Sequence, residues 1–383
     1  MTKNTAAMKK TAERLLVELA SLPTAAGHEG AVADFVRRWV GARPRLVIKR
    51  DPCGNLLVSR PDFEKACRRV PALLITAHMD HPAFIVKAVE GRRAVLEFRG
   101  GVHDKYFKGA AIEIYDKELG RSCPATVLSL DAAAKPFKTV EAELARPAPY
   151  VEPGCIGRWR FPAGAVTKGL ARVHACDDLA CLAAALLAYE DISRDKKATH
   201  IALLFTRAEE VGFVGAIGAA RGGSIPKDAR LVCLECSRSF PHDSPIGAGP
   251  IVRVGDKMSV FTPELTNTIS DIAAAYQKAN PAFRYQRKLM AGGSCEATGF
   301  ASYGIKSSCL CLPLGNYHNM ADPDAVLAGK KRARVAPEFI SAADYHGLIE
   351  LLGAVARGLD APRRPARAAM ESIWAERAGL LAA

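Results

Sequence analysis

Two adjacent glutamates, Glu209 and Glu210, follow the apolar segment 201–205. This segment predicts a buried strand of a parallel sheet, and open α/β sheets place their ligands at the carboxyl ends of such strands. Two anions are costly to hold there without a cation. A metal ion meets this need, because one glutamate can ligate it while its neighbour takes a proton from a metal-bound water. A surface pair that caps a helix is the alternative interpretation.

A histidine occupies the same kind of position after an earlier apolar segment. Residues 72–76 predict a strand that runs into His78, and Asp80 follows two residues later. If the chain stays extended, the two side chains lie on the same face. An imidazole that binds a metal is usually oriented by a carboxylate that accepts from its second nitrogen. The spacing of His78 and Asp80 would supply such a pair.

Two adjacent aspartates, Asp177 and Asp178, precede the helical segment 180–189. Aspartates at this point can simply cap the helix, where its dipole favours negative charge. A carboxylate in this position can also bridge two metal ions while its neighbour orients the surroundings. Both interpretations remain open from these two residues alone.

Further candidate ligands follow two later strands. Glu235 ends the apolar segment 230–234, and His318 follows the apolar segment 307–312. Two imidazoles and three carboxylates at strand ends of one sheet form a ligand set for two divalent ions. The predicted metal ligands are His78, Asp177, Glu210, Glu235 and His318.

The elements that must position these residues predict an α/β fold with a mixed, mainly parallel sheet flanked by helices. The pattern of apolar residues gives the elements. The expected strands outside the insert are 46–49, 55–59, 72–76, 172–175, 201–205, 230–234 and 307–312. The expected helices are 11–22, 29–40, 180–189, 263–277, 342–359 and 370–381.

A small all-β domain is predicted inside this α/β fold. Short β-like segments at 84–89, 94–98, 111–115 and 125–130 alternate with Gly, Asp and Pro turns. The predicted organisation is therefore a catalytic domain in two parts with a β insert and a helical extension. The four segments are 1–81, 82–165, 166–360 and 361–383.

Composition limits the classes of function. The chain has 383 residues, 49% of them hydrophobic, and a net charge of +13. Basic clusters at 330–334 and 363–367 lack the interleaved aromatic residues or motifs of a nucleic-acid site. A solvated basic surface is the preferred interpretation, so no nucleic-acid partner is predicted.

No apolar run is long enough for a membrane helix, and residues 1–21 form a charged amphipathic pattern rather than a signal peptide. No membrane partner is therefore predicted. The 11 cysteines fit reduced thiols of a cytoplasmic protein. The pairs Cys233/Cys236 and Cys309/Cys311 are interpreted as buried thiols rather than a zinc site.

The order of these motifs resembles the co-catalytic metallopeptidases, and within them the tetrahedral, deblocking or glutamyl aminopeptidases. The segment 205–216, FTRAEEVGFVGA, is similar to that family's catalytic segment. Weaker similarities lie at 246–252 and 292–297. The interval between Asp80 and Asp177 leaves room for a β insert, and these aminopeptidases place one there.

The resemblance implies how the ligands are shared between two ions. Asp177 would bridge both metals, and the peptide bond after it would be cis. His78 and Glu235 would complete one metal site, while Glu210 and His318 would complete the other. Zinc is the favoured metal, with cobalt and manganese as alternatives.

The resemblance also implies the chemistry. Glu209 would act as general base and then as the acid that protonates the leaving amine, and Asp80 would orient His78. The protein would be a metallo-aminopeptidase that removes N-terminal residues from peptides. It would assemble with itself, from dimers up to a hollow dodecamer, with the β insert serving contacts and access.

Three departures from the family pattern affect the expected substrate. Glu235 stands where the family usually has Asp, Leu179 where it commonly has Arg, and Cys295-Glu296 where it has Thr-Asp. Two alternatives therefore remain: a di-metal amidohydrolase or deacylase acting on a non-peptide amide, and a catalytically silent oligomeric scaffold. The presence of Glu209 argues against the scaffold.

Overall fold

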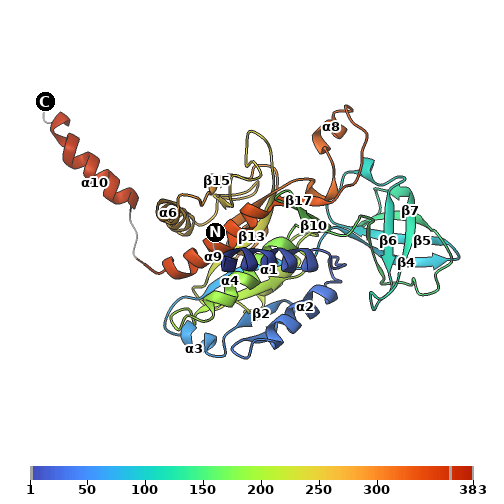
Figure 1. Ribbon diagram of the computed structural model, residues 1–383, viewed down its shortest axis with the longest axis horizontal. Helices are drawn as coiled ribbons and strands as arrows, with labels where there is room; N and C mark the ends of the chain where they lie inside the picture. The colour runs from blue at the N-terminus through green and yellow to red at the C-terminus, as the bar shows by residue number, and fades with distance from the viewer. Residues whose placement is uncertain (1–2, 362–364, 382–383) are drawn as a thin grey trace.

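A computed structural model describes residues 3–361 and 365–381. It contains one large α/β body, a β-barrel at one end of it and a helix, α10, that leaves it at the opposite end (Figure 1). The strands are β1 (Val47–Arg50), β2 (Leu56–Ser59), β3 (Leu73–His78), β4 (Ala83–Glu90), β5 (Arg93–Arg99), β6 (Ala111–Tyr115), β7 (Ser122–Asp131), β8 (Lys138–Leu144), β9 (Ile156–Trp159), β10 (Ala165–Thr167), β11 (Leu170–Val173), β12 (Ile201–Thr206), β13 (Arg230–Arg238), β14 (Ile251–Arg253), β15 (Gln286–Lys288), β16 (Lys306–Leu314) and β17 (Glu338–Ser341). The α-helices are α1 (Lys3–Leu19), α2 (Gly30–Gly41), α3 (Phe63–Cys67), α4 (Leu179–Ile192), α5 (Val214–Arg221), α6 (Pro263–Ala279), α7 (Glu296–Ser302), α8 (Pro323–Leu327), α9 (Ala342–Gly358) and α10 (Pro365–Arg377).

The centre of the body is an 8-stranded sheet in the order β1-β2-β12-β3-β13-β16-β14-β15. Its middle strands β12, β3, β13 and β16 are parallel to one another, whereas β2 and β14 run antiparallel to their neighbours in this group. All six residues of β3 and of β12 are buried, because helices cover both faces of the sheet. The predicted mixed, mainly parallel sheet is confirmed.

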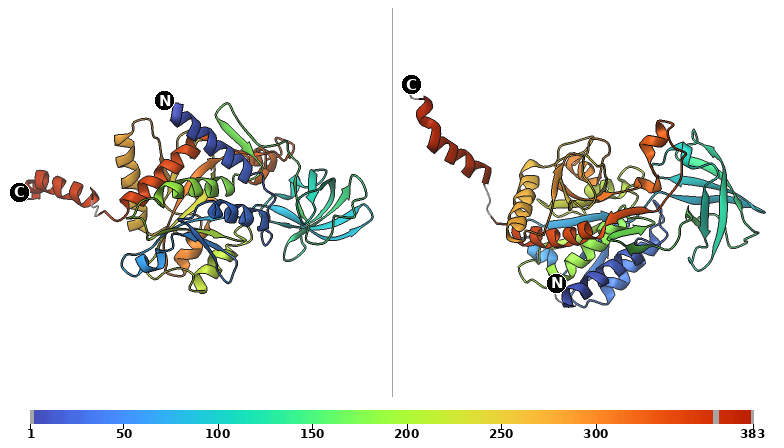
Figure 2. Two further views of the ribbon diagram at one scale, coloured as in Figure 1. Left: turned by 60° about the horizontal axis from the view of Figure 1, so that its bottom comes forward. Right: turned by 45° about the horizontal axis from the view of Figure 1, so that its top comes forward.

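Two hydrophobic cores hold these helices against the sheet. One face packs against α1, α2, α4, α6 and α9, and the other against the shorter α3, α5 and α7 (Figure 2). Helix α4 is buried on nearly its whole surface, which explains its almost uninterrupted run of Ala and Leu. The predicted helices at 29–40, 180–189, 263–277 and 342–359 correspond to α2, α4, α6 and α9.

The insert between β3 and β10 is a closed barrel in the order β4-β5-β8-β7-β6-β9. Its core contains Phe84, Phe98, Phe107 and Trp159, whose rings meet mainly edge to face. Barrel closure removes the exposed strand edges that an isolated sheet of this size would have. The predicted all-β insert is confirmed as part of the fold class, while the four domain boundaries remain predictions.

Several short elements were not among the predicted ones. Strands β8 and β9 complete the barrel, and β17 joins β10 and β11 in a 3-stranded sheet. The four residues of β17 carry too little alternation to be recognised alone, and they form a strand because β11 pairs with them. The first helix spans Lys3–Leu19 rather than the predicted 11–22, and turn hydrogen bonds from the Ser21 and Leu22 N–H groups follow its end.

The predicted C-terminal helix is present as α10 and a 3-10 turn over Ala378–Leu381. Within the predicted extension 361–383, residues 362–364 and 382–383 lie outside the described residues, as does part of the basic cluster 363–367. No helix among the described residues is long and apolar enough to cross a membrane.

The connection from β12 to α5 depends on a close approach of two backbone segments. The Gly215 N–H donates to the Arg207 carbonyl, and the Asn55 side chain binds both Arg207 N–H and the Gly215 carbonyl. A Cβ atom on Gly215 would lie 2.7 Å from Asn55 Oδ1 and closer still to the Arg207 backbone. Only glycine fits this position, which is why the loop that carries Glu209 and Glu210 is compact.

We therefore expect Gly215→Ala to lower the free energy of unfolding by about 1–3 kcal/mol, because the added methyl group must displace backbone atoms. Urea unfolding followed by circular dichroism measures this change. Gly30→Ala is the matched control, because a Cβ atom there meets nothing within 4 Å. Equal stabilities of the two variants would contradict the proposed role of the close approach.

Candidate metal centre

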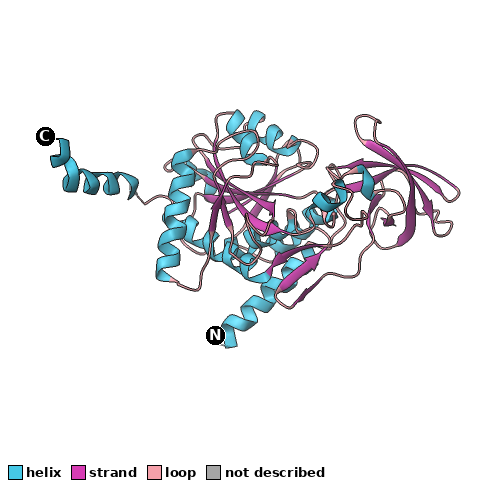
Figure 3. Cartoon of the chain, turned by 90° about the horizontal axis from the view of Figure 1, so that it is seen from above, coloured by secondary structure: helices cyan, strands magenta, loops and turns pink. Residues whose placement is uncertain are grey.

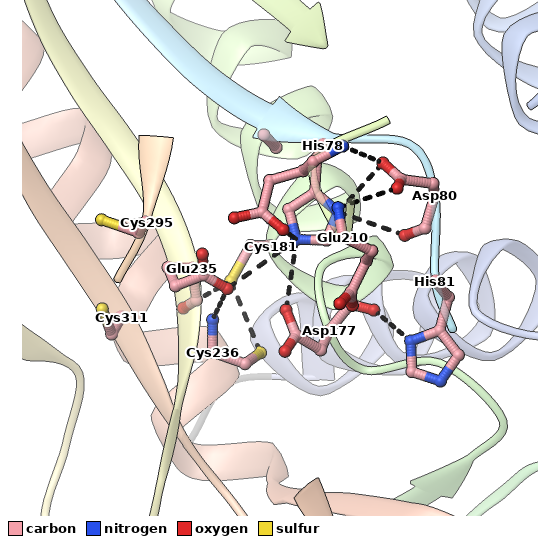
Figure 4. A network of polar contacts seen from close by, with 12 residues as sticks. His78, Asp80, His81, Asp177, Cys181, Glu210, Glu235, Cys236, Cys295 and Cys311 are labelled. Carbon is pink, nitrogen blue, oxygen red and sulfur yellow. Dashed lines mark hydrogen bonds and ion pairs between the residues drawn. The ribbon is translucent and has the colours of Figure 1, made fainter. Parts of the chain in front are cut away.

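The sequence-predicted site residues come together at the carboxyl ends of the central parallel strands. His78 is the last residue of β3, Glu209 and Glu210 follow β12, and Glu235 lies near the end of β13. Asp177 is joined by a cis peptide bond to Asp178, the residue before α4, and His318 follows β16. Figure 4 shows most of these side chains pointing toward one another. All of the side chains are at least nine-tenths buried.

Asp177 lies between two groups of side chains. Its Oδ1 is 3.3 Å from His78 Nε2, and Glu235 Oε1 is 3.8 Å from the same nitrogen. Its Oδ2 is 3.7 Å from His318 Nε2, which is also 3.2 Å from Glu210 Oε2. The two carboxylate oxygens of Asp177 thus face two different imidazoles, an arrangement that suits a bridging ligand.

Buried oxygens without a hydrogen-bond partner show where the donor set could hold metal ions. Asp177 Oδ1 and Glu210 Oε1 are buried and have no hydrogen-bond partner. In the described part of the chain, the ion pairs of Asp177, Glu209, Glu210 and Glu235 are with histidines alone. Buried carboxylates of this kind need cations, so the residues fit two divalent ions.

Asp80 joins the histidine to the two glutamates. Its carboxylate accepts hydrogen bonds from the N–H groups of Glu209 and Glu210, both at 3.0 Å. Its Oδ1 is 3.5 Å from His78 Nδ1, and its carbonyl oxygen is 3.1 Å from that nitrogen. These contacts leave Nε2 of His78 directed at Asp177, which fits the predicted orienting role of Asp80.

Glu29 supports the loop that carries Glu209 and Glu210, and sequence reasoning missed this role. Its carboxylate accepts from Ala208 N–H at 3.0 Å and from Arg207 Nε at 2.7 Å. Ala208 has a φ of 52°, an uncommon conformation for a residue with a Cβ. The contacts of Glu29 stabilise this conformation and thereby the direction of Glu209. No local spacing in the sequence links Glu29 to residue 208.

Glu338, the first residue of β17, is a second residue that sequence reasoning missed. Its two carboxylate oxygens accept from the backbone N–H groups of Asp177 at 3.0 Å and His318 at 2.8 Å. His318 has a φ of 52°, so its backbone also needs external support. Glu338 therefore fixes Asp177 and His318 relative to each other. We call the five candidate ligands and Glu209 together the cage.

His81 contacts the carbonyl group of Asp177, whereas Glu338 contacts its N–H group. Its Nδ1 is 2.6 Å from the Asp177 carbonyl oxygen, which can only accept. Burial lowers the pKa of His81, so the neutral ring donates this hydrogen bond. His81 is one residue beyond Asp80, but its partner is distant in the sequence, and the short HxD pattern gave no reason to include it.

The electrostatic state of the cage follows from the crowding of acids. Burial raises the pKa of Asp177 to about 6, with the charge of Glu235 acting in the same direction. Burial acts to lower the pKa of His318, but the charge and hydrogen bond of Glu210, together with the charge of Asp177, outweigh it and bring the value to about 9. Burial also raises the pKa of Glu209 well above its usual range, against the effect of His78. A carboxyl of this kind is suited to acid–base work near neutral pH.

The cysteines near the cage behave as the sequence predicted. Cys233, Cys236, Cys309 and Cys311 are all buried and free. Cys236 is within reach of Asp178 and Cys181, a group whose donor atoms could also hold an ion. However, Cys236 Sγ donates to the Cys176 carbonyl at 3.5 Å and Cys181 Sγ donates to the Glu235 carbonyl at 3.3 Å. Both thiols are therefore satisfied in their protonated form.

The departures from the family pattern differ in where they lie. Leu179 is fully buried in the core around α4, so its side chain adds to packing. Cys295 is also fully buried, on the opposite face of the sheet. Glu296 is only 2% exposed, and neither carboxylate oxygen has a hydrogen-bond partner. Burial raises the pKa of Glu296 to about 7, against the effect of His78.

The cage opens into a cavity of about 660 Å³, a size typical of small-ligand sites. Its walls come from both modules: Gly101 and Lys138 belong to the insert, and Arg253 and Lys288 belong to the body. Glu209, Glu210, Glu235, Asp177 and His318 form part of its lining. A substrate in this cavity would contact the candidate metal ligands directly.

Comparisons with known proteins give a family match and several similar folds. A model of the M42 glutamyl aminopeptidase family matches residues 148–331. No curated protein sequence matches the chain significantly. The predicted resemblance to this aminopeptidase family is confirmed by the family match.

The fold is shared with solved aminopeptidase structures of low sequence identity. An aminopeptidase of the archaeon Desulfurococcus kamchatkensis is 18% identical with a TM-score of 0.72, and the match covers 92% of this chain and 96% of that one. A TET aminopeptidase of a marine sediment Thaumarchaeota archaeon is 16% identical with a TM-score of 0.72 over 92% and 97% of the two chains. The TET1 peptidase of Pyrococcus horikoshii is 17% identical with a TM-score of 0.68 over 90% and 98%. These likenesses confirm the predicted fold class.

The bridging contacts of Glu338 lead to a prediction about metal affinity. We expect Glu338→Gln to weaken divalent metal binding about 10–100-fold, because one backbone N–H loses its acceptor and the cage loses its geometry. Competition with a chromophoric chelator measures the affinity. Asp344→Asn is the control, since Asp344 also accepts from two buried N–H groups, at Gly247 and Gly249, far from the cage. A metal affinity lowered equally in both variants would refute a specific role for Glu338.

The burial of Glu296 leads to a prediction about pH dependence. The folded carboxyl keeps its proton up to about pH 7, whereas its ordinary pKa is 4.5. The stability that this difference contributes is complete below pH 4.5 and is lost as the pH rises to about 7, a loss of about 3 kcal/mol. We therefore expect the metal-free protein to lose more stability over this interval than its Glu296→Gln variant. Urea unfolding at a series of pH values checks this, and identical pH profiles would exclude it.

Proposed function

We propose that the protein is a di-metal aminopeptidase that hydrolyses N-terminal residues from peptides. The observation that carries the proposal is the position of Asp177 between two imidazole–carboxylate groups, with unpartnered buried oxygens on Asp177 and Glu210. The family match at residues 148–331 supports the peptidase class. A silent scaffold would have no need to keep this cage, including Glu209.

The proposed ligands divide into two sets that share one member. His78 and Glu235 would hold one ion, Glu210 and His318 would hold the other, and Asp177 would contribute an oxygen to each. Nitrogen and carboxylate donors of this kind suit zinc, with cobalt and manganese as alternatives. Such ions would supply Lewis-acid polarisation of the scissile carbonyl and would lower the pKa of a bound water molecule.

Glu209 is the proposed general base. It lines the cavity, and its Oε2 is 3.9 Å from His78 Nε2, at the border of the cage. Asp80 and Glu29 hold the backbone on either side of it. Glu209 takes a proton from the attacking water and gives it to the departing amine, so that the carboxylate is regenerated. Its raised pKa favours the first of these steps, because a carboxylate with a higher pKa is a stronger base.

Self-association is part of the proposal. Solved structures with this fold include a dodecamer and a peptidase that assembles into a tetrahedron or an octahedral shell. We propose that this chain also forms a homo-oligomer, and that it acts in the cytoplasm on small peptides. The walls of the cavity contributed by the insert would then limit which peptides reach the cage.

Replacement of the proposed base tests the mechanism. We expect Glu209→Gln to reduce kcat on aminoacyl anilides by about 10²–10⁴-fold, because a neutral amide cannot accept the proton. The variant should still hold about two divalent ions per chain, measured by elemental analysis. Chelation should abolish the wild-type activity, and added metal should restore it.

The same assay separates the proposed activity from the alternative amidohydrolase. A panel of aminoacyl anilides and N-acyl amino acids is compared at equal enzyme concentration. Faster turnover of anilides supports the aminopeptidase, whereas turnover of N-acyl amino acids alone would reassign the substrate class. A Glu209→Gln variant with full activity would overturn the mechanism, and a wild-type protein that takes up no metal would overturn the ligand assignment.

A further inference from the structure

Helix α10 projects from the body and presents its side chains to solvent. In all the overall views it extends away from the end of α9, opposite the barrel (Figures 1, 2 and 3). Its side-chain hydrogen bonds are internal: Arg367 donates to Glu371, and Ser372 donates to Glu376. Between residues 367 and 381, every side chain except that of Ala378 is exposed.

One side of this helix is apolar. Met370, Ile373 and Trp374 are spaced by three and four residues, so they lie on one face. They are exposed by 60%, 43% and 61%, and Leu380 and Leu381 beyond the helix are exposed by 78% and 76%. A helix of 13 residues is marginal in water by itself. A partner that covers this face, which we call the arm face, would therefore stabilise the helix.

We call the C-terminal extension that carries α10 the arm. Its size and charge indicate what the partner is. The five side chains expose on the order of 500 Å² of apolar surface, near the upper limit for one patch of a monomer. A reciprocal exchange of two arms buries about twice this area plus the surfaces that receive them, which reaches the range of about 1,200–2,000 Å² for a stable interface. Residues 361–383 carry four arginines and two glutamates, a net charge of +2. The glutamates lie among the arginines, so the net attraction to an anionic membrane is weaker than that of the clusters of about 4–8 basic residues that bind one.

The body exposes an apolar patch that matches the arm face. Met258, Val260 and Leu289 are exposed by 68%, 74% and 50%. Val260 and Leu289 are neighbours, since a Cβ atom on Gly255 would lie 3.1 Å from the Cα of Val260 and 3.2 Å from Cδ1 of Leu289. Leu289 also lines the cavity, so this receiving patch lies at the rim of the candidate site.

We propose that two copies of this chain exchange their arms, so that the arm face of each copy packs on the receiving patch of the other. Such a contact is self-complementary and closes with twofold symmetry. It would place the arm of one copy at the cavity rim of its partner. The inference extends the proposed self-association and does not depend on the proposed chemistry.

The first test changes the arm face in the full chain. In sedimentation velocity experiments over a range of concentrations, we expect the double variant Ile373→Gln/Trp374→Gln to associate at least tenfold more weakly than the wild type. Ala375→Gln is the matched control, because it places the same side chain on the opposite side of the helix. Its association should equal that of the wild type.

The second test changes the receiving patch. We expect Met258→Gln/Val260→Gln to weaken association as much as the arm variant does. Combining all four substitutions should add little, because both pairs remove the same contact. Additive losses would show that the arm and the patch do not bind each other. Both pairs are exposed, so circular dichroism should show an unchanged fold.

Tryptophan fluorescence reports on the arm directly. Of the three tryptophans, Trp39 and Trp159 are 7% and 1% exposed, while Trp374 is 61% exposed. On assembly, we expect Trp374 to become protected from acrylamide quenching, which the comparison with Trp374→Gln isolates. A Trp374 that remains quenchable in the assembled protein would overturn the proposal, as would unchanged association of the arm variant. Protection in a monomer would mean that the arm folds back, and binding to phosphatidylserine vesicles without a change in mass would assign it to lipid.

Discussion

The structure depends on holding several buried carboxylates close together at the bottom of a cavity. Four carboxylates meet at the carboxyl ends of the central parallel strands: Asp177, Glu209, Glu210 and Glu235. The side chains that pair with them are histidines. An uncompensated charge in such a place costs several kcal/mol, so this edge is stable only with bound cations or with protons. Without cations, the same cost raises the pKa values of Asp177, Glu209 and His318, because protons then compensate the buried negative charge. Metal binding and the stability of this part of the fold are therefore coupled.

A second set of buried carboxylates makes the arrangement rigid. Asp80, Glu29 and Glu338 accept hydrogen bonds from backbone N–H groups of the residues that carry the candidate ligands and base. They thereby hold backbone segments at Ala208 and His318 that have positive φ. The cage is defined by these supports as much as by its own side chains, because a ligand displaced by an ångström no longer shares an ion with its neighbour.

The parts of this site that are visible in the sequence are those with a local signal. A buried strand that ends in His, Asp or Glu identifies the candidate ligands one at a time, and the resemblance to a family groups them. Glu338 lies 161 residues from Asp177, and Glu29 lies 179 residues from Ala208. Only the folded chain brings these pairs together, so no spacing could reveal them. The same holds for β17, a four-residue strand that exists because β11 offers it an edge.

The cage and the surroundings of the cavity obey different constraints. The candidate ligands sit on buried strand ends, where a substitution disturbs packing and charge together. The walls come from peripheral segments: Lys138 belongs to the barrel, Lys288 and Leu289 to the edge of the sheet, and the proposed arm to another copy. These segments can change without altering the geometry of the cage. In the proposed aminopeptidase, the insert and the proposed contacts between copies would therefore set access and substrate choice, while the sheet would fix the reaction.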